Sequence, residues 1–387
     1  MTPTSLYLIP IVLLCVAFLV HLPVRQKWQV PVIRSGYAVL LIGALTLFHA
    51  QPAVIEEVNA LTGVANFSAP LVYALNTAFS GACLALVINW RGGEAHWLRR
   101  VWLRCLSLYS ICAATVVILF VLGSAPVERT TDFDSYYATT PYIREMILLY
   151  LAAHSVAMIT MLWLCATWQR EVHGMLRAGL LLIVIGACFD IAGFQAAKYA
   201  SVAARWGGRD LDFLSTSVAP VAVSIAAFLV ALGFILPRAS SQWEALRTYR
   251  DLDRLRAALR HVDIPVPPAS AWWLAPTARL TRREATLHDA LLHLNPHFSR
   301  EVFDEARAGA LAAGHSPAAA DVAAQAAVVV RAVRAYTADL PPTNASGTYQ
   351  LQATQGGAGA LAELSRALPD AAAGPGAHSL PASPRQP

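Results

Sequence analysis

The chain has little charge and almost no lysine. Only 14% of its 387 residues are charged, 56% are hydrophobic, and the mean hydropathy is +0.49, values outside the range of soluble globular domains. Lys27 and Lys198 are the only lysines, so the net charge of +5 comes almost wholly from arginine. Charge is sparse up to Pro237 and dense from Arg238 to Arg334. This pattern indicates a membrane protein with loops facing anionic lipid, and no nucleic-acid partner.

Motifs for catalysis or cofactor binding are also lacking. The six cysteines all lie in apolar stretches and form no CxxC pair, which favours a packing role over a disulfide or a metal site. We find no glycine-rich phosphate loop, nucleophile elbow, paired intramembrane carboxylates or Ser/His dyad at workable spacing. The sequence therefore predicts no cofactor and no enzymatic activity.

Long apolar runs dominate the first 237 residues. Each of seven runs has about 18 to 24 residues, enough for a helix to cross a hydrocarbon core of about 30 Å. Helices are required because backbone polar groups in lipid must pair within their own segment. We expect the first run to be a retained helix, since no basic segment precedes it. The predicted spans are Ser5–Leu22, Gly36–Ala53, Phe67–Trp90, Cys105–Gly123, Met146–Trp168, Ala178–Ala197 and Leu214–Leu236.

Loop charges predict the orientation of this seven-helix bundle. Basic residues prevail in one set of alternate loops and after the last span, and most acidic residues lie in the other set. By the positive-inside rule the N-terminus is outside the cell and the C-terminal domain is cytoplasmic. The basic side includes Arg25, Lys27, Arg34, Arg91, Arg99, Arg100, Arg104, Arg170, Arg177 and Arg238. The acidic side includes Glu56, Glu57, Glu128, Asp132, Asp134, Glu145, Asp210 and Asp212.

A polar layer is predicted inside the bundle. Ionisable residues within spans are default functional candidates, and His154 and Asp190 stand on adjacent antiparallel helices at similar depth, counted from the turn between those helices. Asn76 and Ser224 lie at comparable depth, with Gln195 nearer the outside. This layer is either a proton relay or polar substrate site, with Asp190 titrating and His154 as its partner, or a structural interhelical hydrogen bond. The candidate substrate- or proton-binding residues are Asp190, His154, Asn76, Ser224 and Gln195.

Helix packing around Asp190 is predicted from small residues. Gly186, Asp190, Gly193 and Ala197 follow a 4-3-4 spacing that places them on one helix face. Such faces let neighbouring helices approach closely. The Asp190 carboxylate is therefore expected to meet protein and not lipid.

The C-terminal region, residues 238–340, is predicted to be a small cytosolic helical domain. An amphipathic helix from Gln242 to Leu259 precedes a proline-rich break at Ile264–Ser270. Three further helices follow, at Thr281–Leu294, Ser299–Ala313 and Pro317–Thr337, with Ser299 and Ser316 as N-caps and Gly314 as a C-cap. The predicted core is Leu287, Leu291, Leu294, Val302, Phe303, Leu311, Val322, Val329 and Val333.

Two further features of this region bear on function. His288, Asp289, His293 and His297 fit no standard zinc spacing, so no metal is expected. Residues 341–387 are rich in Ala, Gly, Pro and Ser and are predicted to be a disordered tail, with Ala358–Leu368 as a candidate short helix.

The layout resembles an uncharacterised actinobacterial family with seven membrane helices and a cytosolic C-terminal domain of unknown function, whose members are labelled transporters. The resemblance covers nearly all of residues 1–340 and is most specific at Leu280–Leu294. There Arg282, Arg283 and Asp289 fit a basic pair followed by an acidic run into a Leu-rich helix. Thr286 and His288 stand where an acid and an arginine are expected. The resemblance implies transport.

Two functions remain open at this point. The first is a plasma-membrane transporter of an unidentified small solute or ion, with proton coupling through the polar layer. The second is a seven-helix sensor or membrane anchor whose residues 242–337 engage a cytosolic protein partner. The lipid bilayer is the partner common to both.

Overall fold

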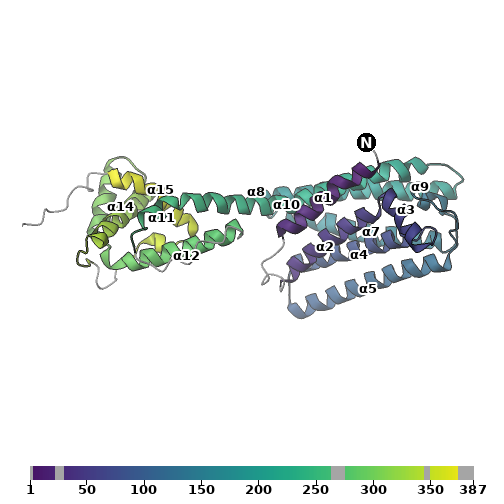
Figure 1. The fold of residues 1–387 in the computed structure, drawn as a ribbon, viewed down its shortest axis with the longest axis horizontal. Coiled ribbons are helices and arrows are strands. Elements are labelled where there is room, and N and C mark those ends of the chain that lie inside the picture. The colour runs from purple at the N-terminus through teal and green to yellow at the C-terminus, as the bar shows by residue number, and fades with distance from the viewer. Residues whose placement is uncertain (1–2, 22–29, 263–274, 344–348, 374–387) are drawn as a thin grey trace, which may run out of the picture. The chain divides into compact units, whose positions relative to one another are not determined.

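The computed structural model describes residues 3–21, 30–262, 275–343 and 349–373, and every regular element in these ranges is a helix. The chain divides into an N-terminal unit, Met1–Ala239, and a C-terminal unit, Ser240–Pro387 (Figure 1). The all-α class is thus confirmed for this part of the chain. The basic loop with Arg25 and Lys27, the proline-rich break at Ile264–Ser270 and the last residues of the predicted tail lie outside the described ranges.

The N-terminal unit contains long helices joined by short turns, with two short helices between them. The first long helices are α1 Pro3–His21, α2 Pro31–His49, α4 Ser68–Arg91, α5 Ala95–Leu122 and α7 Ile143–Trp168. The sixth predicted span is α8 Gly174–Phe189, η2 Asp190–Gln195 and α9 Ala196–Trp206, and the seventh is η3 Leu214–Val218 and α10 Ala219–Asp251. The two short helices are α3 Pro52–Thr62 and α6 Phe133–Tyr136.

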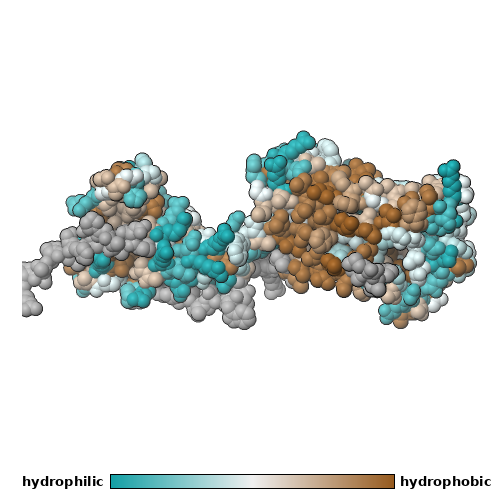
Figure 2. All heavy atoms as spheres, turned by 90° about the horizontal axis from the view of Figure 1, so that it is seen from above, coloured by the Kyte–Doolittle hydropathy of each residue, from teal (hydrophilic) through white to brown (hydrophobic). Residues whose placement is uncertain are grey.

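The surface of the N-terminal unit is that of a membrane protein. Six helices of the described chain are long and apolar enough to cross a bilayer, and Leu6–Leu19 is a shorter apolar stretch. Figure 2 shows the broad hydrophobic surface over this unit, with hydrophilic residues toward its ends. Ile111, Val121, Val156 and Trp163 are among the large apolar side chains that it exposes. The count of seven spans and their orientation stay predictions.

Two helices widen into π-helical segments where they face one another. In η3 the Ala219 amide bonds the carbonyl of Leu214, five residues back. Pro220 favours this widening because it has no N–H to offer the Thr216 carbonyl. The other segment, η2, begins at Asp190. Single π-turns inside α-helices are frequent at functional sites.

A seam of small residues packs the sixth span against α10. A Cβ atom added at Gly179 would lie 2.6 Å from the Gly233 carbonyl oxygen, and one at Gly193 would lie 2.5 Å from the Ala222 Cβ. Gly186 meets the Ala226 carbonyl oxygen in the same way, at 3.0 Å. The close backbone approach is therefore possible only with glycine on this face.

One end of the bundle is closed by α3, α6 and their loops, and we refer to it as the capped end. Asn66 has a φ of 61° and its amide donates to the carbonyls of Ala125 and Val127, at 2.9 and 2.8 Å. Asn59 donates to the Glu128 carboxylate at 2.8 Å. These buried amides join the segment before α4 to the segment after α5.

The loop between α9 and η3 lies at the capped end as well. Arg205 Nε donates to Asp212 Oδ1 at 2.8 Å. This hydrogen bond, together with the positive charge of the guanidinium, holds the pKa of Asp212 below its ordinary value.

The C-terminal unit is a separate helical domain. Its helices after the end of α10 are α11 Asp253–Ala258, α12 Pro276–Leu294, η4 Asn295–His297, α13 Arg300–Ala312, α14 Pro317–Thr337, η5 Gln352–Thr354 and α15 Ala358–Ala373. Ser299 and Ser316 cap α13 and α14 by accepting from backbone amides, and Gly314 has a φ of 84°. The predicted N-caps are therefore confirmed, and Gly314 directly follows the C-cap residue, Ala313.

Two predictions for this unit are wrong in part. Leu311 is 38% exposed and does not belong to the core. Disorder from residue 341 does not hold for residues 349–373, because Leu351, Leu361 and Leu364 are buried in the core beside Leu291. The prediction of disorder was based on the alanine- and glycine-rich composition, whereas the apolar residues of 349–373 recur at helical spacing and form a buried helix face.

Candidate functional site

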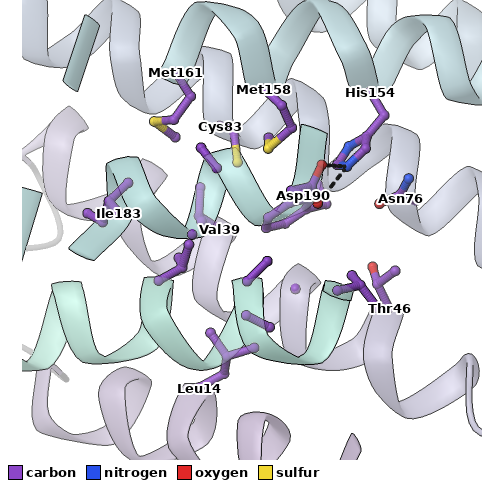
Figure 3. A pocket seen from close by; sticks show the side chains of 18 of the residues that line it. Leu14, Val39, Thr46, Asn76, Cys83, His154, Met158, Met161, Ile183 and Asp190 are labelled. Carbon is purple, nitrogen blue, oxygen red and sulfur yellow. Dashed lines mark hydrogen bonds and ion pairs between the residues drawn. The ribbon is translucent and has the colours of Figure 1, made fainter. Parts of the chain in front are cut away.

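His154 and Asp190 form a buried pair inside the bundle. His154 Nε2 on α7 lies 3.1 Å from Asp190 Oδ1 and 3.2 Å from Oδ2 at the start of η2 (Figure 3). Their side chains are 2% and 9% exposed. The structure therefore brings these two residues into contact, as predicted.

Ser80 on α4 holds the other nitrogen of the His154 ring. Ser80 Oγ lies 2.8 Å from His154 Nδ1 and donates to the Asn76 carbonyl oxygen, also at 2.8 Å. A hydroxyl has one proton, so in the arrangement in which Ser80 donates to the Asn76 carbonyl, Nδ1 is the donor in its contact with Ser80. In that arrangement Nε2 is the ring nitrogen that shares a proton with Asp190.

Gln195 is brought to Asp190 by the π-helical geometry. Residues five apart in an α-helix point about 140° away from each other, whereas a π-turn places them in line. Gln195 Nε2 donates to Asp190 Oδ1 at 2.5 Å, and Ser155 donates to Gln195 Oε1 at 2.6 Å. Tyr199 reaches Ser155 at 3.2 Å. Gln195 is thus a direct partner of Asp190, where the sequence placed it nearer the outside.

The pair borders a cavity of about 90 Å³ between α1, α2, α4, α7, α8 and α10. Asn76, Thr46 and His154 lie near one end of it, and Met161 and Ile183 lie near the other (Figure 3). A cavity of this size has room for several water molecules or for a small solute. Most of the wall is apolar, and its aromatic residues are Phe79, Trp90 and Phe234.

A second polar cluster lies between the cavity and the capped end. Asp134 on α6 is 1% exposed and pairs with Lys198 Nζ at 2.5 Å. Tyr73 and Tyr150 both donate to its carboxylate, and their rings stack with centroids 3.9 Å apart. Tyr150 lies four residues before His154 and so on the same face of α7.

The predicted residues separate into those at the site and one outside it. Asp190, His154 and Asn76 line the cavity. Gln195 is not part of the cavity wall and donates a hydrogen bond to the Asp190 carboxylate. Ser224 is buried but donates to the Pro220 carbonyl of its own helix and is not part of the cavity wall.

Ser80 and the Asp134 cluster were missed as members of a site. Tyr73 and Ser80 are seven residues apart in the third span and so lie on one helix face with Asn76 between them, which was the available signal. The sequence around Asp134 contains no such signal, because this residue is predicted to be an exposed loop acid and only the fold buries it.

In the C-terminal unit two of the candidate histidines pack against a tyrosine. The rings of His293 and His297 each lie 5.8 Å from that of Tyr336. In the described ranges no group of three or more His, Cys, Asp or Glu side chains is placed to hold a metal ion.

Comparison with known proteins adds a label for one unit. Residues 242–370 match the model of a family of unknown function, DUF6545. The match covers about a third of the chain and lies within the C-terminal unit. No curated protein and no solved structure matches the chain. The chain is thus an all-helical, membrane-type protein that carries a domain of unknown function, and a transporter family and its bacterial source stay predictions.

Proposed function

We propose that the protein is a transporter that moves a small solute through the cavity, with proton coupling at the His154–Asp190 pair. The observation that carries this proposal is the pair itself, buried at the polar end of a largely apolar cavity. Burial of ionisable groups in a membrane is costly and typically serves ion or proton pathways.

The proton inventory supports coupling. With Nδ1 protonated, the contact between Nε2 and Asp190 holds one further proton, and the pair is neutral whichever partner has it. Loss of that proton leaves one uncompensated negative charge beside apolar walls. Solute occupancy and protonation are therefore energetically linked.

The finer topology is part of this proposal. We place the protein in the plasma membrane with seven spans, the capped end outside, and the C-terminal unit in the cytoplasm, as the loop charges favour. No chemical step is assigned to the site. Ser80 has a residue type found in hydrolases, but its hydroxyl bonds the Asn76 carbonyl and its side chain is not in the cavity wall.

Access from both faces of the membrane tests transport. Cys83 lines the cavity, whereas Cys165 is fully buried outside its wall. Two single-cysteine proteins, each retaining one of these and having alanine at the other five positions, are reconstituted in vesicles. A membrane-impermeant methanethiosulfonate is then applied from either side.

A transporter exposes Cys83 to the reagent from each side in turn, while Cys165 stays unmodified in the matched control. Modification of Cys83 from one side alone would contradict transport. Equal modification of both cysteines would show that the helix bundle has loosened. A cysteine at a second cavity-lining position, Thr46→Cys, then replaces Cys83 as the reporter.

A sensor is the second candidate, and one observation favours it. Helix α10 lines the cavity through Val223, Val230 and Phe234, and its last residues, as far as Asp251, belong to the matched domain of unknown function. In this function a change in cavity occupancy is passed along the chain to residues 242–337, which engage a cytosolic protein partner. One-sided access to Cys83 would support this function over transport.

A further inference from the structure

We propose that the solute is a small monovalent organic cation with an apolar body, and that it is exchanged for one proton at the His154–Asp190 pair. This inference rests on the proposed transport function and specifies its substrate. It follows from the charge inventory of the cavity, from the composition of its wall, and from the contact between His154 Nε2 and the Asp190 carboxylate.

The first step concerns charge. Asp190 is the only carboxylate among the described lining residues, and none of these is Lys or Arg. The titratable groups facing Asp190 are His154 on α7 and the Cys83 thiol on α4. The buried pair outside the wall, Asp134 with Lys198, is neutral in sum. The cavity therefore has zero net charge with the shared proton and one negative charge without it.

The second step concerns the cost of that negative charge. An unpaired carboxylate beside apolar walls is strongly unfavourable. Gln195 contributes one hydrogen bond to it but no charge. A cation in the cavity restores neutrality, and it does so only after the proton has left. The exchange is balanced: one organic cation enters, the proton on Nε2 or Asp190 passes to water, and no covalent bond of the solute changes.

The third step concerns the body of the solute. Phe79 packs near the His154 ring, with centroids 6.3 Å apart, and Trp90 and Phe234 lie further along the wall, 6.4 Å apart. Aromatic faces attract organic cations, and most strongly where water is excluded. The thioethers of Met158 and Met161 add polarisable, adaptable surface. A strongly hydrated inorganic ion would find few polar ligands along this wall.

The test uses the full-length protein in detergent micelles with benzyltrimethylammonium as the probe. This cation has an aromatic body and no N–H group. Its carbon isostere, neopentylbenzene, has nearly the same shape without the charge. Binding is followed by calorimetry in two buffers of different ionisation enthalpy, which gives the number of protons released for each cation bound.

We expect one proton released per cation, and an affinity that rises about tenfold per pH unit while the pair is protonated. Neopentylbenzene should bind more weakly and release no proton. Asp190→Asn should abolish proton release and weaken cation binding by at least tenfold. Asp212→Asn removes a partly buried carboxylate outside the cavity and should change neither quantity.

Equal binding of both probes, or cation binding without proton release, would overturn the cation inference. Helicity and thermal unfolding are measured for Asp190→Asn and Asp212→Asn to show that both variants keep the fold. Where Asp190→Asn does not fold, Asp190→Glu replaces it, and proton release is then expected to persist. If the cation inference fails but Cys83 is modified from both sides, the protein is a transporter of another solute. If cation binding releases a proton but Cys83 is modified from one side only, the transport proposal is contradicted.

Discussion

Asp134 and Lys198 show how a single ion pair can be fixed by burial. The Asp134 carboxylate is 1% exposed, while the Lys198 side chain retains 15% exposure. Tyr73 and Tyr150 satisfy the carboxylate further. The lysine can therefore reach water if its partner is lost, and the aspartate cannot. Removal of Lys198 and removal of Asp134 should therefore lower the unfolding free energy by different amounts.

At the residue scale we predict an asymmetric mutant cycle for this pair. Lys198→Met leaves a buried carboxylate unpaired and should cost about 3–5 kcal/mol of unfolding free energy. Asp134→Asn should cost less, and the double variant should be more stable than Lys198→Met alone. Reversible unfolding in mixed micelles measures all four proteins. Additive single and double effects would mean that the pair has no net coupling.

Single residues also set the limit of prediction at this scale. His154 and Asp190 were predicted together because helix periodicity and the turn between two spans fix depth along a helix. Asn76 on α4 was placed at the same depth, but depth does not show which side chain of α4 meets His154, and Ser80 was therefore not joined to the pair. The contact between Ser80 and His154 Nδ1 depends on the packing of α4 against α7.

At the element scale, the sixth span combines two kinds of geometry. Gly179, Gly186 and Gly193 recur every seven residues and bring the helix against α10. The π-turn at Asp190–Gln195 lies within this seam. Gly186 and Gly193 were visible in the sequence as part of a face of small residues, whereas Gly179 was not included in it. The π-turn was not predicted, because no proline or other local signal marks Asp190–Gln195.

Removal of one residue from η2 should convert the π-turn to α-helix. Ala192 is small and exposed, and a π-turn amounts to one extra residue in an α-helix. Deletion of Ala192 should keep both flanking helices in register but turn Gln195 away from Asp190. We expect unchanged helicity by circular dichroism and at least a tenfold weaker affinity for benzyltrimethylammonium. Insertion of Ala after Trp168, in the turn beyond α7, is the matched length control and should leave binding intact.

At the scale of the whole molecule, the two units differ in what stabilises them. The N-terminal unit exposes large apolar side chains and encloses polar ones, as expected where lipid is the solvent. The C-terminal unit buries leucines such as Leu255, Leu291 and Leu364 in one core. Because that core is complete within Ser240–Pro387, we expect the unit to fold when produced alone.

A pair of leucine substitutions tests this core and the extent of the domain. Leu364 is 1% exposed and lies in the segment that its composition marked as disordered, whereas Leu311 was predicted as core but is 38% exposed. In isolated residues 240–387, Leu364→Ala should cost about 2–5 kcal/mol in urea unfolding. Leu311→Ala should change stability by about 0.5 kcal/mol or less. Equal effects would contradict the assignment of α15 to the core.

The sequence by itself determined the helical class, the membrane character of the first unit, most helix ends and the meeting of His154 with Asp190. These depend on composition, on the period of 3.6 residues and on capping residues, all of which act over short distances along the chain. Tertiary structure decided the rest: the cavity, the Ser80 contact, the π-turn that delivers Gln195, and the burial of Asp134. Each of these depends on which helix faces share an interior, and local periodicity does not specify such pairings.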